Sequence, residues 1–128
     1  MPPSVIAVLP RSADSEVICD SLDREGIGVR IASSPEEALG LLAMAEASVI
    51  LYDTDTGQPW PDALRRFQRI RSDLRMVLLT ASADHHTWME LFDHGAFDLL
   101  LRPLQPADLR SVVRCALDPP RFFHAAAA

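Results

Sequence analysis

The stretch "VILYDTDTG", residues 49–57, decides the fold of this chain. Four apolar or aromatic residues run directly into Asp53, and a second aspartate and a glycine follow within a few positions. A short run of this composition is typical of a strand that is buried on both faces. Asp53 would therefore lie at the carboxyl end of a strand, either as the first residue of a plain turn or as a reactive carboxylate.

Four further runs share this composition of valine, isoleucine and leucine. Together the five runs predict strands at Val5–Leu9, Val29–Ala32, Val49–Tyr52, Met76–Leu79 and Phe97–Leu101, each buried on both faces. The segments between and after them carry apolar residues at helical spacing. The pattern is clearest at Leu109, Val112, Val113, Ala116 and Leu117.

Helix boundaries can be located from particular residues. Ser34, Pro35 and Glu37 have the spacing of a capping box with proline at the first helical position. Gly26 and Gly95 each stand where a helix must end before a strand, a position at which a left-handed conformation favours glycine. The chain is therefore expected to hold five strands that alternate with five helices.

Strict alternation of strands and helices predicts an α/β fold, a doubly wound (βα)5 parallel sheet with helices on both faces. For five strands the flavodoxin-like order 2-1-3-4-5 is common, and its switch point lies between the first and third strands. Ligands bind beyond the carboxyl ends of the strands at that point. This topology would place Asp53 beside the residues that follow Leu9.

The length bounds the number of domains. At 128 residues and 14.1 kDa the chain suits one domain, expected over residues 1–118. Residues 119–128, "PPRFFHAAAA", are interpreted as a tail, a linker or a cloning scar. No apolar run is long enough to cross a bilayer and no secretory signal is evident, so we expect a cytoplasmic protein without a membrane partner.

The charge and the cysteines exclude further classes. A formal net charge of −6 argues against nucleic acid as a partner of this domain. All twelve basic residues are arginine. Cys19 and Cys115 are expected to be buried free thiols, since disulfides are rare in the cytosol.

Three stretches carry a family resemblance: "VILYDTDTG", "MVLLTAS" and "HGAFDLLLRPLQPADL". With them, the chain from Ser4 to Leu117 resembles the receiver domain of response regulators in bacterial two-component systems. The third stretch, a Gly-Ala pair, a strand, a basic residue and a proline, is specific in its order and spacing. The resemblance implies a phosphorelay signalling module that is no enzyme, and a sensor histidine kinase or another signalling protein as its partner.

The resemblance also implies roles for individual residues. Asp53 matches the aspartate that accepts a phosphoryl group, and Thr80 and Arg102 match the residues that bind this group and transmit the switch. A carboxylate nucleophile needs cations nearby to neutralise the transferred group. The face formed by the fourth helix, fifth strand and fifth helix is the surface through which a homodimer would form.

The chain departs from the family pattern at three places. Pro10 and Arg11 stand where the family has the acidic pair that holds magnesium, and an arginine offers no oxygen ligand. Arg102 replaces the usual lysine, and Leu99 replaces the aromatic switch residue. We therefore expect no metal and no cofactor, although Asp14 is a candidate substitute ligand for Mg²⁺.

Two functional hypotheses follow. In the first and favoured one, the chain is an atypical receiver that acts by protein–protein interaction, with metal-dependent phosphorylation of Asp53 impaired or lost. In the alternative, a histidine kinase phosphorylates Asp53. A small enzyme on the same fold is disfavoured because the sequence has no glycine-rich phosphate loop. Arg11 either pairs with Asp53 in place of the metal or points to solvent.

Three other features have a functional and a plain interpretation. His86, Glu90 and His94 share one predicted helix face, which is a zinc site or, in the favoured interpretation, a solvated surface. Five arginines between positions 65 and 75 suggest nucleic-acid contact or, more simply, an exposed surface. Trp60 either covers the site or anchors its own loop.

Overall fold

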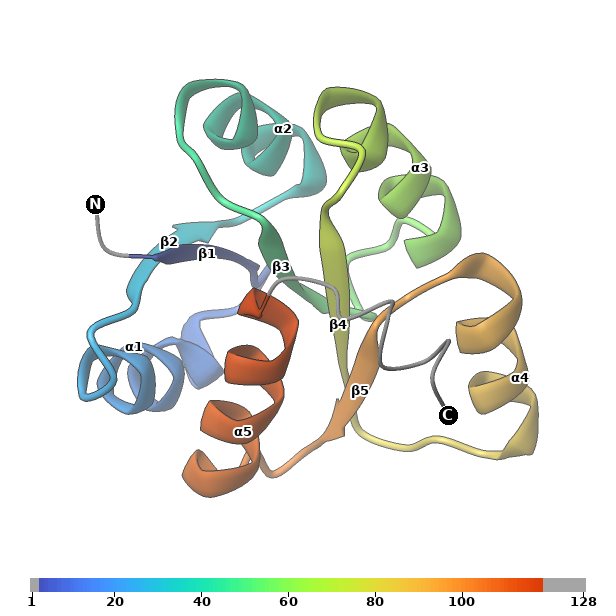
Figure 1. Cartoon of the computed structure of the whole chain (residues 1–128). Coiled ribbons are helices and arrows are strands. Elements are labelled where there is room, and N and C mark those ends of the chain that lie inside the picture. Colours follow the sequence, from blue (N-terminus) through green and yellow to red (C-terminus); the bar gives the residue numbers. More distant parts are fainter. Residues whose placement is uncertain (1–2, 119–128) are drawn as a thin grey trace, which may run out of the picture.

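The computed structural model describes residues 3–118, and its strands form one parallel sheet (Figure 1). The strand order is β2-β1-β3-β4-β5, which confirms the predicted topology. The strands are β1 (Ser4–Val8), β2 (Gly28–Ala32), β3 (Val49–Asp53), β4 (Arg75–Thr80) and β5 (Asp98–Leu101). The tail expected over residues 119–128 lies outside the described part of the chain.

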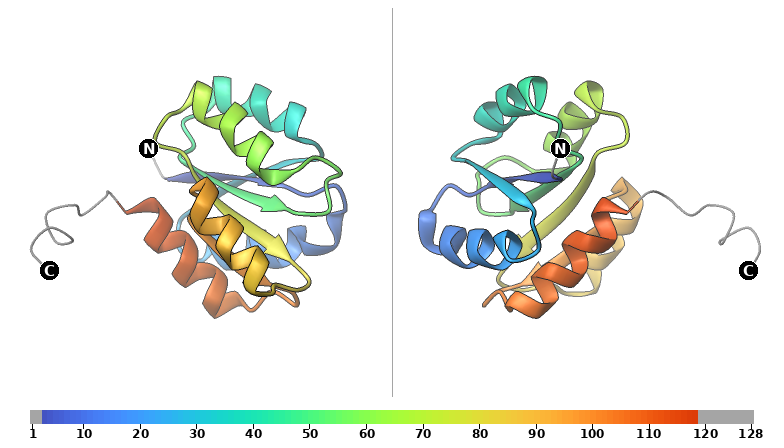
Figure 2. Two further views of the ribbon diagram at one scale, coloured as in Figure 1. Left: turned by 90° about the vertical axis from the view of Figure 1, so that its right-hand side faces the viewer. Right: turned by 60° about the vertical axis from the view of Figure 1, so that its left-hand side comes forward.

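Helices cover both faces of the sheet, as alternation of strands and helices requires. They are α1 (Ser15–Asp23), α2 (Pro35–Met44), α3 (Trp60–Ile70), α4 (His85–His94) and α5 (Pro106–Leu117), and a short 3₁₀ helix, η1 (Ser12–Asp14), precedes α1. Figures 1 and 2 show α1 and α5 together on one face, with α2, α3 and α4 on the other. Within residues 3–118, no helix combines the length and the apolar character that crossing a bilayer requires.

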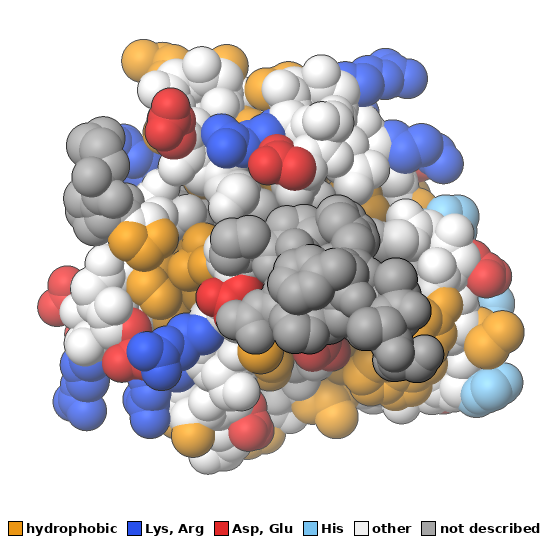
Figure 3. Space-filling view, in the orientation of Figure 1, with side chains coloured by type: hydrophobic (Ala, Val, Ile, Leu, Met, Phe, Trp, Pro, Cys, Tyr) orange, Lys and Arg blue, Asp and Glu red, His pale blue; other side chains and the backbone are white. Residues whose placement is uncertain are grey.

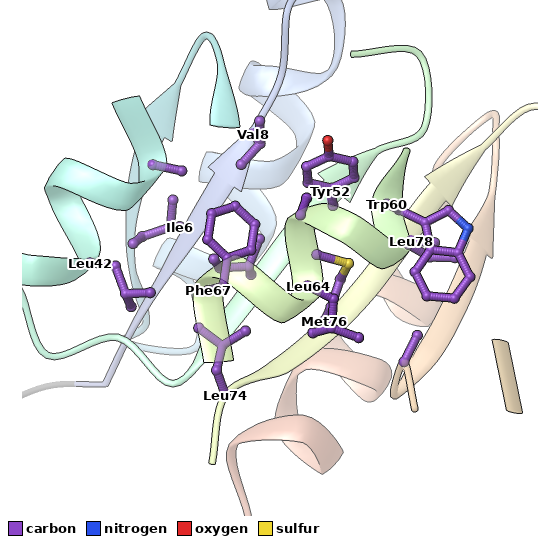
Figure 4. Close-up of a cluster of buried hydrophobic side chains, with 14 of the residues drawn as sticks. Ile6, Val8, Leu42, Tyr52, Trp60, Leu64, Phe67, Leu74, Met76 and Leu78 are labelled. Atoms are coloured by element: carbon purple, nitrogen blue, oxygen red, sulfur yellow. The ribbon is translucent and has the colours of Figure 1, made fainter. Parts of the chain in front are cut away.

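Alternate residues of the central strands build two separate cores. Under α2, α3 and α4, Tyr52 of β3 packs edge-to-face on Phe67, with ring centroids 6.3 Å apart (Figure 4). Under α1 and α5, the neighbouring Leu51 packs with Ile18 and Leu109. Strands β1 and β3 are almost fully buried, so the prediction of two-sided burial is confirmed for the middle of the sheet.

For β2 that prediction is wrong. This strand lies at the edge of the sheet and pairs only with β1. Gly28, Arg30 and Ile31 are exposed, and Ala32 alone in the strand is buried. The prediction also fails at the end of β5, the other edge strand, where Leu101 is exposed. An apolar run shows that a segment is a strand, but burial also depends on the strand's place in the sheet.

The predicted helix boundaries are largely confirmed. The hydroxyl oxygen of Ser34 accepts a hydrogen bond from the backbone N–H of Glu37 (3.2 Å). The carboxylate of Glu37 accepts from the Ser33 hydroxyl (2.9 Å), so the expected capping box is replaced by a related arrangement. Gly95 ends α4 with φ = 80°, and Gly26 follows α1 with φ = 72°, the left-handed values that favour glycine.

Candidate functional site

Asp53 is the last residue of β3, at the carboxyl edge of the sheet, and pairs in register with Leu79 of β4. Only 8% of its side chain is exposed. The backbone N–H of Asp55 donates to its Oδ1 (2.8 Å), and the backbone N–H of Thr54 donates to the carbonyl oxygen of Leu79 (3.1 Å). The turn after β3 therefore holds this buried carboxylate in one orientation.

Arg102 follows β5 and joins Asp53 to a second carboxylate. Its Nη2 donates to Oδ2 of Asp53 (2.9 Å), while its Nε donates to Oδ2 of Asp14 in η1 (2.7 Å). The side chains of Arg102 and Asp14 are 21% and 20% exposed, so both ion pairs are largely shielded from water. One guanidinium thus bridges two carboxylates from segments far apart in the sequence.

The planar guanidinium suits this bridging role. It offers several donors in a fixed fork, whereas a lysine ammonium is a single point charge. Burial alone would lower the pKa of Arg102, but the hydrogen bonds and negative charges of Asp14 and Asp53 outweigh it and raise this pKa above the ordinary arginine value. Arg102 therefore remains charged.

Arg11 does not pair with Asp53. Pro10 and Arg11 are both exposed in the turn after β1, and of the two interpretations of Arg11 the solvent-facing one is correct. The cation beside Asp53 is Arg102, whose backbone N–H donates to the carbonyl oxygen of Thr80 (2.8 Å) and so fixes the start of the side chain next to the site. Asp14, the candidate substitute ligand for a metal, is in the site but is bound to Arg102.

Thr80 ends β4 and pairs in register with Leu101 of β5. It therefore lies at the same edge of the sheet as Asp53 and the start of the β5–α5 connection. Its hydroxyl donates to the carbonyl oxygen of Ser82 (3.0 Å), and within the described residues it has no hydrogen bond to Asp53. The predicted topology thus brings Asp53, Thr80 and Arg102 to one edge, and direct side-chain contacts join only the first and the last.

Leu99, the residue at the aromatic switch position, is 6% exposed and belongs to the core under α2, α3 and α4. Phe97 precedes β5 and is partly exposed. The guanidinium carbon of Arg75 lies 5.1 Å from the centre of its ring. Phe97 is thus engaged at the amino-terminal end of the sheet, away from the edge that carries Asp53.

A polar network in the loop after Asp53 was not predicted. The Tyr52 hydroxyl lies 2.7 Å from Oγ1 of Thr56 and donates to the carbonyl oxygen of Gln58 (3.0 Å). The side-chain amide of Gln58 donates to Glu36 of α2 (2.6 Å) and accepts from Arg66 of α3 (3.2 Å). The loop is therefore tied to both helices. Only the polar composition of the loop could have signalled this in the sequence.

The three candidate zinc ligands of α4 do not converge. His86 Nε2 lies 3.3 Å from Oε1 of Glu90, while the ring of His94 packs edge-to-face on Trp60 with centroids 5.6 Å apart. Among the described residues no group of three potential ligands is arranged to hold a metal. Trp60 is buried at the start of α3 and forms part of the core, so it anchors its own segment.

The arginines between positions 65 and 75 are mostly paired with carboxylates. Arg65 pairs with Asp62, Arg66 with Glu36 (3.5 Å) and Arg71 with Asp73 (3.3 Å). The plainer expectation, an exposed surface, is confirmed for Arg65 and Arg69, whereas Arg66, Arg71 and Arg75 are half-buried.

Both cysteines are free thiols, as predicted. The expectation that they are buried is wrong, because Cys19 is half-buried and Cys115 is exposed. Burial and the nearby Asp20 and Asp23 raise the pKa of Cys19.

Comparisons with known proteins agree with this geometry. The family profile of the response regulator receiver domain matches residues 13–114. The structure is similar to a response regulator from Thermotoga maritima (TM-score 0.84, 21% identity, 91% of this chain and 98% of that chain). It is also similar to the chemotaxis response regulator CheY4 of Vibrio cholerae (TM-score 0.80, 22% identity, 91% and 100%). No curated protein was found to be similar in sequence.

The solved structures share the fold, and the family profile spans most of the chain, including Asp14, Asp53 and Arg102. Members of this family are signalling modules of two-component systems, which interact with histidine kinases and other signalling proteins. The chain belongs to the response regulator receiver domain family.

Proposed function

We propose that this receiver domain signals by protein–protein interaction and that metal-dependent phosphorylation of Asp53 is impaired or lost. The observation that carries this proposal is the 2.9 Å contact between Arg102 Nη2 and Asp53 Oδ2. The oxygen that would attack a phosphorus atom, or bind a metal, already accepts from a cation. The other carboxylate oxygen of Asp53, Oδ1, accepts from the backbone N–H of Asp55.

The residues present do not fit a magnesium ion. Mg²⁺ requires near-octahedral oxygen ligands. Pro10 and Arg11 supply no carboxylate where relatives have an acidic pair, and Asp14 is bound to Arg102. A divalent ion beside the guanidinium would also meet like-charge repulsion in a poorly solvated site.

One observation favours the alternative, a working phosphoacceptor. Asp53 is held at a strand end with a permanent positive charge beside it, and such a charge can partly neutralise a transferred phosphoryl group. In that reaction an Asp53 oxygen would form a bond to phosphorus, the phosphorus–nitrogen bond of the kinase's phosphohistidine would break, and the histidine imidazole would leave. With acetyl phosphate as the donor, the bond from phosphorus to the acetate oxygen would break and acetate would leave. Thr80 would then offer its hydroxyl to the new group.

One experiment decides between the two. The chain is incubated with acetyl phosphate, with and without Mg²⁺, and its intact mass is followed. The first hypothesis expects no gain of a phosphoryl group beyond that of Asp53→Asn. A stoichiometric gain that Asp53→Asn loses and the exposed neighbour variant Asp55→Asn keeps would support the alternative instead.

For the interaction itself, we infer a homodimer through the face of α4, β5 and α5. Trp88, Met89 and Phe92 of α4 and Leu101 of β5 are all exposed, Phe92 by 73%. Trp88 and Leu101 line a hollow of about 310 Å³ that continues to Val112 of α5. Figure 3 shows hydrophobic side chains gathered at the lower right, in the region of α4 and β5. A twofold dimer would bury this apolar patch on both subunits at once.

A further inference from the structure

The bridge made by Arg102 connects three segments around the site. Asp14 lies between β1 and α1, Asp53 ends β3, and Arg102 opens the connection from β5 to α5. The two ion pairs span 88 and 49 positions of the chain. One guanidinium thus links three loops at the carboxyl edge of the sheet.

The bridge occupies most of the oxygen atoms that a metal would use. Asp53 Oδ2 accepts from Arg102 at 2.9 Å, Asp53 Oδ1 accepts from the Asp55 backbone at 2.8 Å, and Asp14 Oδ2 accepts from Arg102 at 2.7 Å. Mg²⁺ needs oxygen ligands at about 2.1 Å in octahedral order, so it could bind only after the guanidinium had moved away. Only about a fifth of the Arg102 side chain is exposed, so leaving would break two shielded ion pairs together.

We propose that Arg102 is the resident cation of this site in place of a divalent metal, and that its two ion pairs set the loop arrangement independently of metal. This inference rests on the proposed function, since both concern the charge around Asp53. It goes further in proposing that the two ion pairs hold the loops around Asp53 in one arrangement whether or not a metal is present. The conformation around Asp53 is therefore insensitive to Mg²⁺ and to chelators.

The test uses the whole chain and two readouts. In two-dimensional NMR spectra the amide of Asp55 reports on the Asp53 carboxylate, because its N–H donates to that group. Titration of the wild type with Mg²⁺ is expected to leave this resonance, and the thermal midpoint, unchanged. A saturable shift of the Asp55 amide in the wild type would mean that metal displaces the guanidinium, and would overturn the proposal.

A variant without the Arg102 guanidinium is expected to respond to Mg²⁺, in contrast to the wild type. In Arg102→Met the two carboxylates lose their shared cation, so added Mg²⁺ is expected to raise the thermal midpoint of this variant. Arg69→Met, which removes an exposed arginine of α3, is the matched control and should be as indifferent to Mg²⁺ as the wild type. An Arg102→Met variant that folds and yet ignores Mg²⁺ would also contradict the proposal. If it does not fold, the wild-type titration still decides.

The two proposals fail in different experiments. Phosphorylation of Asp53 without metal would refute the proposal that Asp53 is an impaired phosphoacceptor. It would leave intact the proposal that Arg102 is the resident cation. A wild-type response to Mg²⁺ would refute the resident cation whether or not Asp53 becomes phosphorylated.

Discussion

Arg75 and Ala116 connect the start of β4 to the last turn of α5, with Arg75 Nη1 donating to the carbonyl oxygen of Ala116 over 3.1 Å. The same nitrogen lies 3.2 Å from the carbonyl oxygen of Cys115 and 3.0 Å from that of Asp118. The last carbonyl groups of a helix lack partners within it, and a cation there also interacts favourably with the helix dipole.

Replacing Arg75 by methionine is therefore expected to lower the free energy of unfolding by about 1 to 2 kcal/mol, because these carbonyl groups lose a charged donor. Urea unfolding followed by circular dichroism measures the change. The exposed Arg69→Met should stay within about 0.5 kcal/mol of the wild type. An equal decrease in the free energy of unfolding in the two variants would show that the contact of Arg75 with α5 does not stabilise the fold.

Tyr52 should make the fold sensitive to alkali. Burial raises the pKa of its hydroxyl above the ordinary value of 10.0, against the opposing effect of its hydrogen bond to Thr56. The folded protein thus holds this proton more tightly than the unfolded chain does. The resulting stabilisation is complete below pH 10.0 and is lost as the pH rises through the folded-state pKa.

The sequence makes this measurement direct. Tyr52 is the only tyrosine, so tyrosinate absorbance reports one residue. We expect that absorbance to rise above pH 10.0, together with loss of structure. Tyr52→Phe should be less sensitive to pH over the same range. Tyrosinate that forms at the ordinary pKa in a folded protein would contradict this prediction.

Ser34 begins α2, and its hydroxyl oxygen accepts from the backbone N–H of Glu37. Ser34→Ala is expected to cost about 1 kcal/mol in the free energy of unfolding, because that N–H loses its partner. Ser33→Ala removes an exposed bond between side chains and should cost less. Thermal denaturation of the two variants, side by side, tests whether the backbone cap is the stronger contribution.

The apolar face of α4 predicts self-association. Sedimentation equilibrium of the wild type should show a dimer, and Phe92→Asp should be monomeric, because a charge buried in an apolar interface is poorly tolerated. Met44→Asp is the matched control, since Met44 is an exposed apolar residue at the end of α2. A wild type that stays monomeric over the measurable concentration range would rule out the dimer.

Much of the fold could be predicted because each strand is a short apolar run and each connection contains a helix. Strict alternation leaves few topologies, and the commonest of them proved correct. The exposure of β2 was not read from its composition, because Val29 and Ile31 resemble residues of central strands. It follows instead from the predicted order 2-1-3-4-5, which already places the second and fifth strands at the edges of the sheet.

For the candidate site, the sequence predicted which residues lie at the ends of strands, but not which side chains contact one another. Asp53, Thr80 and Arg102 follow strands, so the topology brings them to one edge. Two arginines, Arg11 and Arg102, lay within reach of Asp53 in the sequence-based picture. Which of the two pairs with Asp53 depends on backbone geometry. Arg11 lies in an exposed turn, whereas a backbone hydrogen bond to Thr80 fixes Arg102 beside the sheet.

The pairing of Arg102 with Asp53 gives the sharpest prediction on stability. Arg102→Met is expected to lower the free energy of unfolding by about 2 kcal/mol at neutral pH, because it leaves the buried charge of Asp53 without a counterion. Introduced into an Asp53→Asn background, the same change should cost much less, since no charge then remains there to be neutralised.

A double-mutant cycle in urea isolates this coupling. Asp14 is unchanged in all four proteins, so the loss of its own pairing with Arg102 is the same in both backgrounds and cancels. A matched cycle with Asp55→Asn in place of Asp53→Asn should show additivity, because Asp55 is exposed and no contact joins its side chain to Arg102 within the described residues. If Arg102→Met costs the same beside Asp53 as beside asparagine, the guanidinium does not stabilise the buried carboxylate, and its contact with Asp53 is a by-product of its pairing with Asp14.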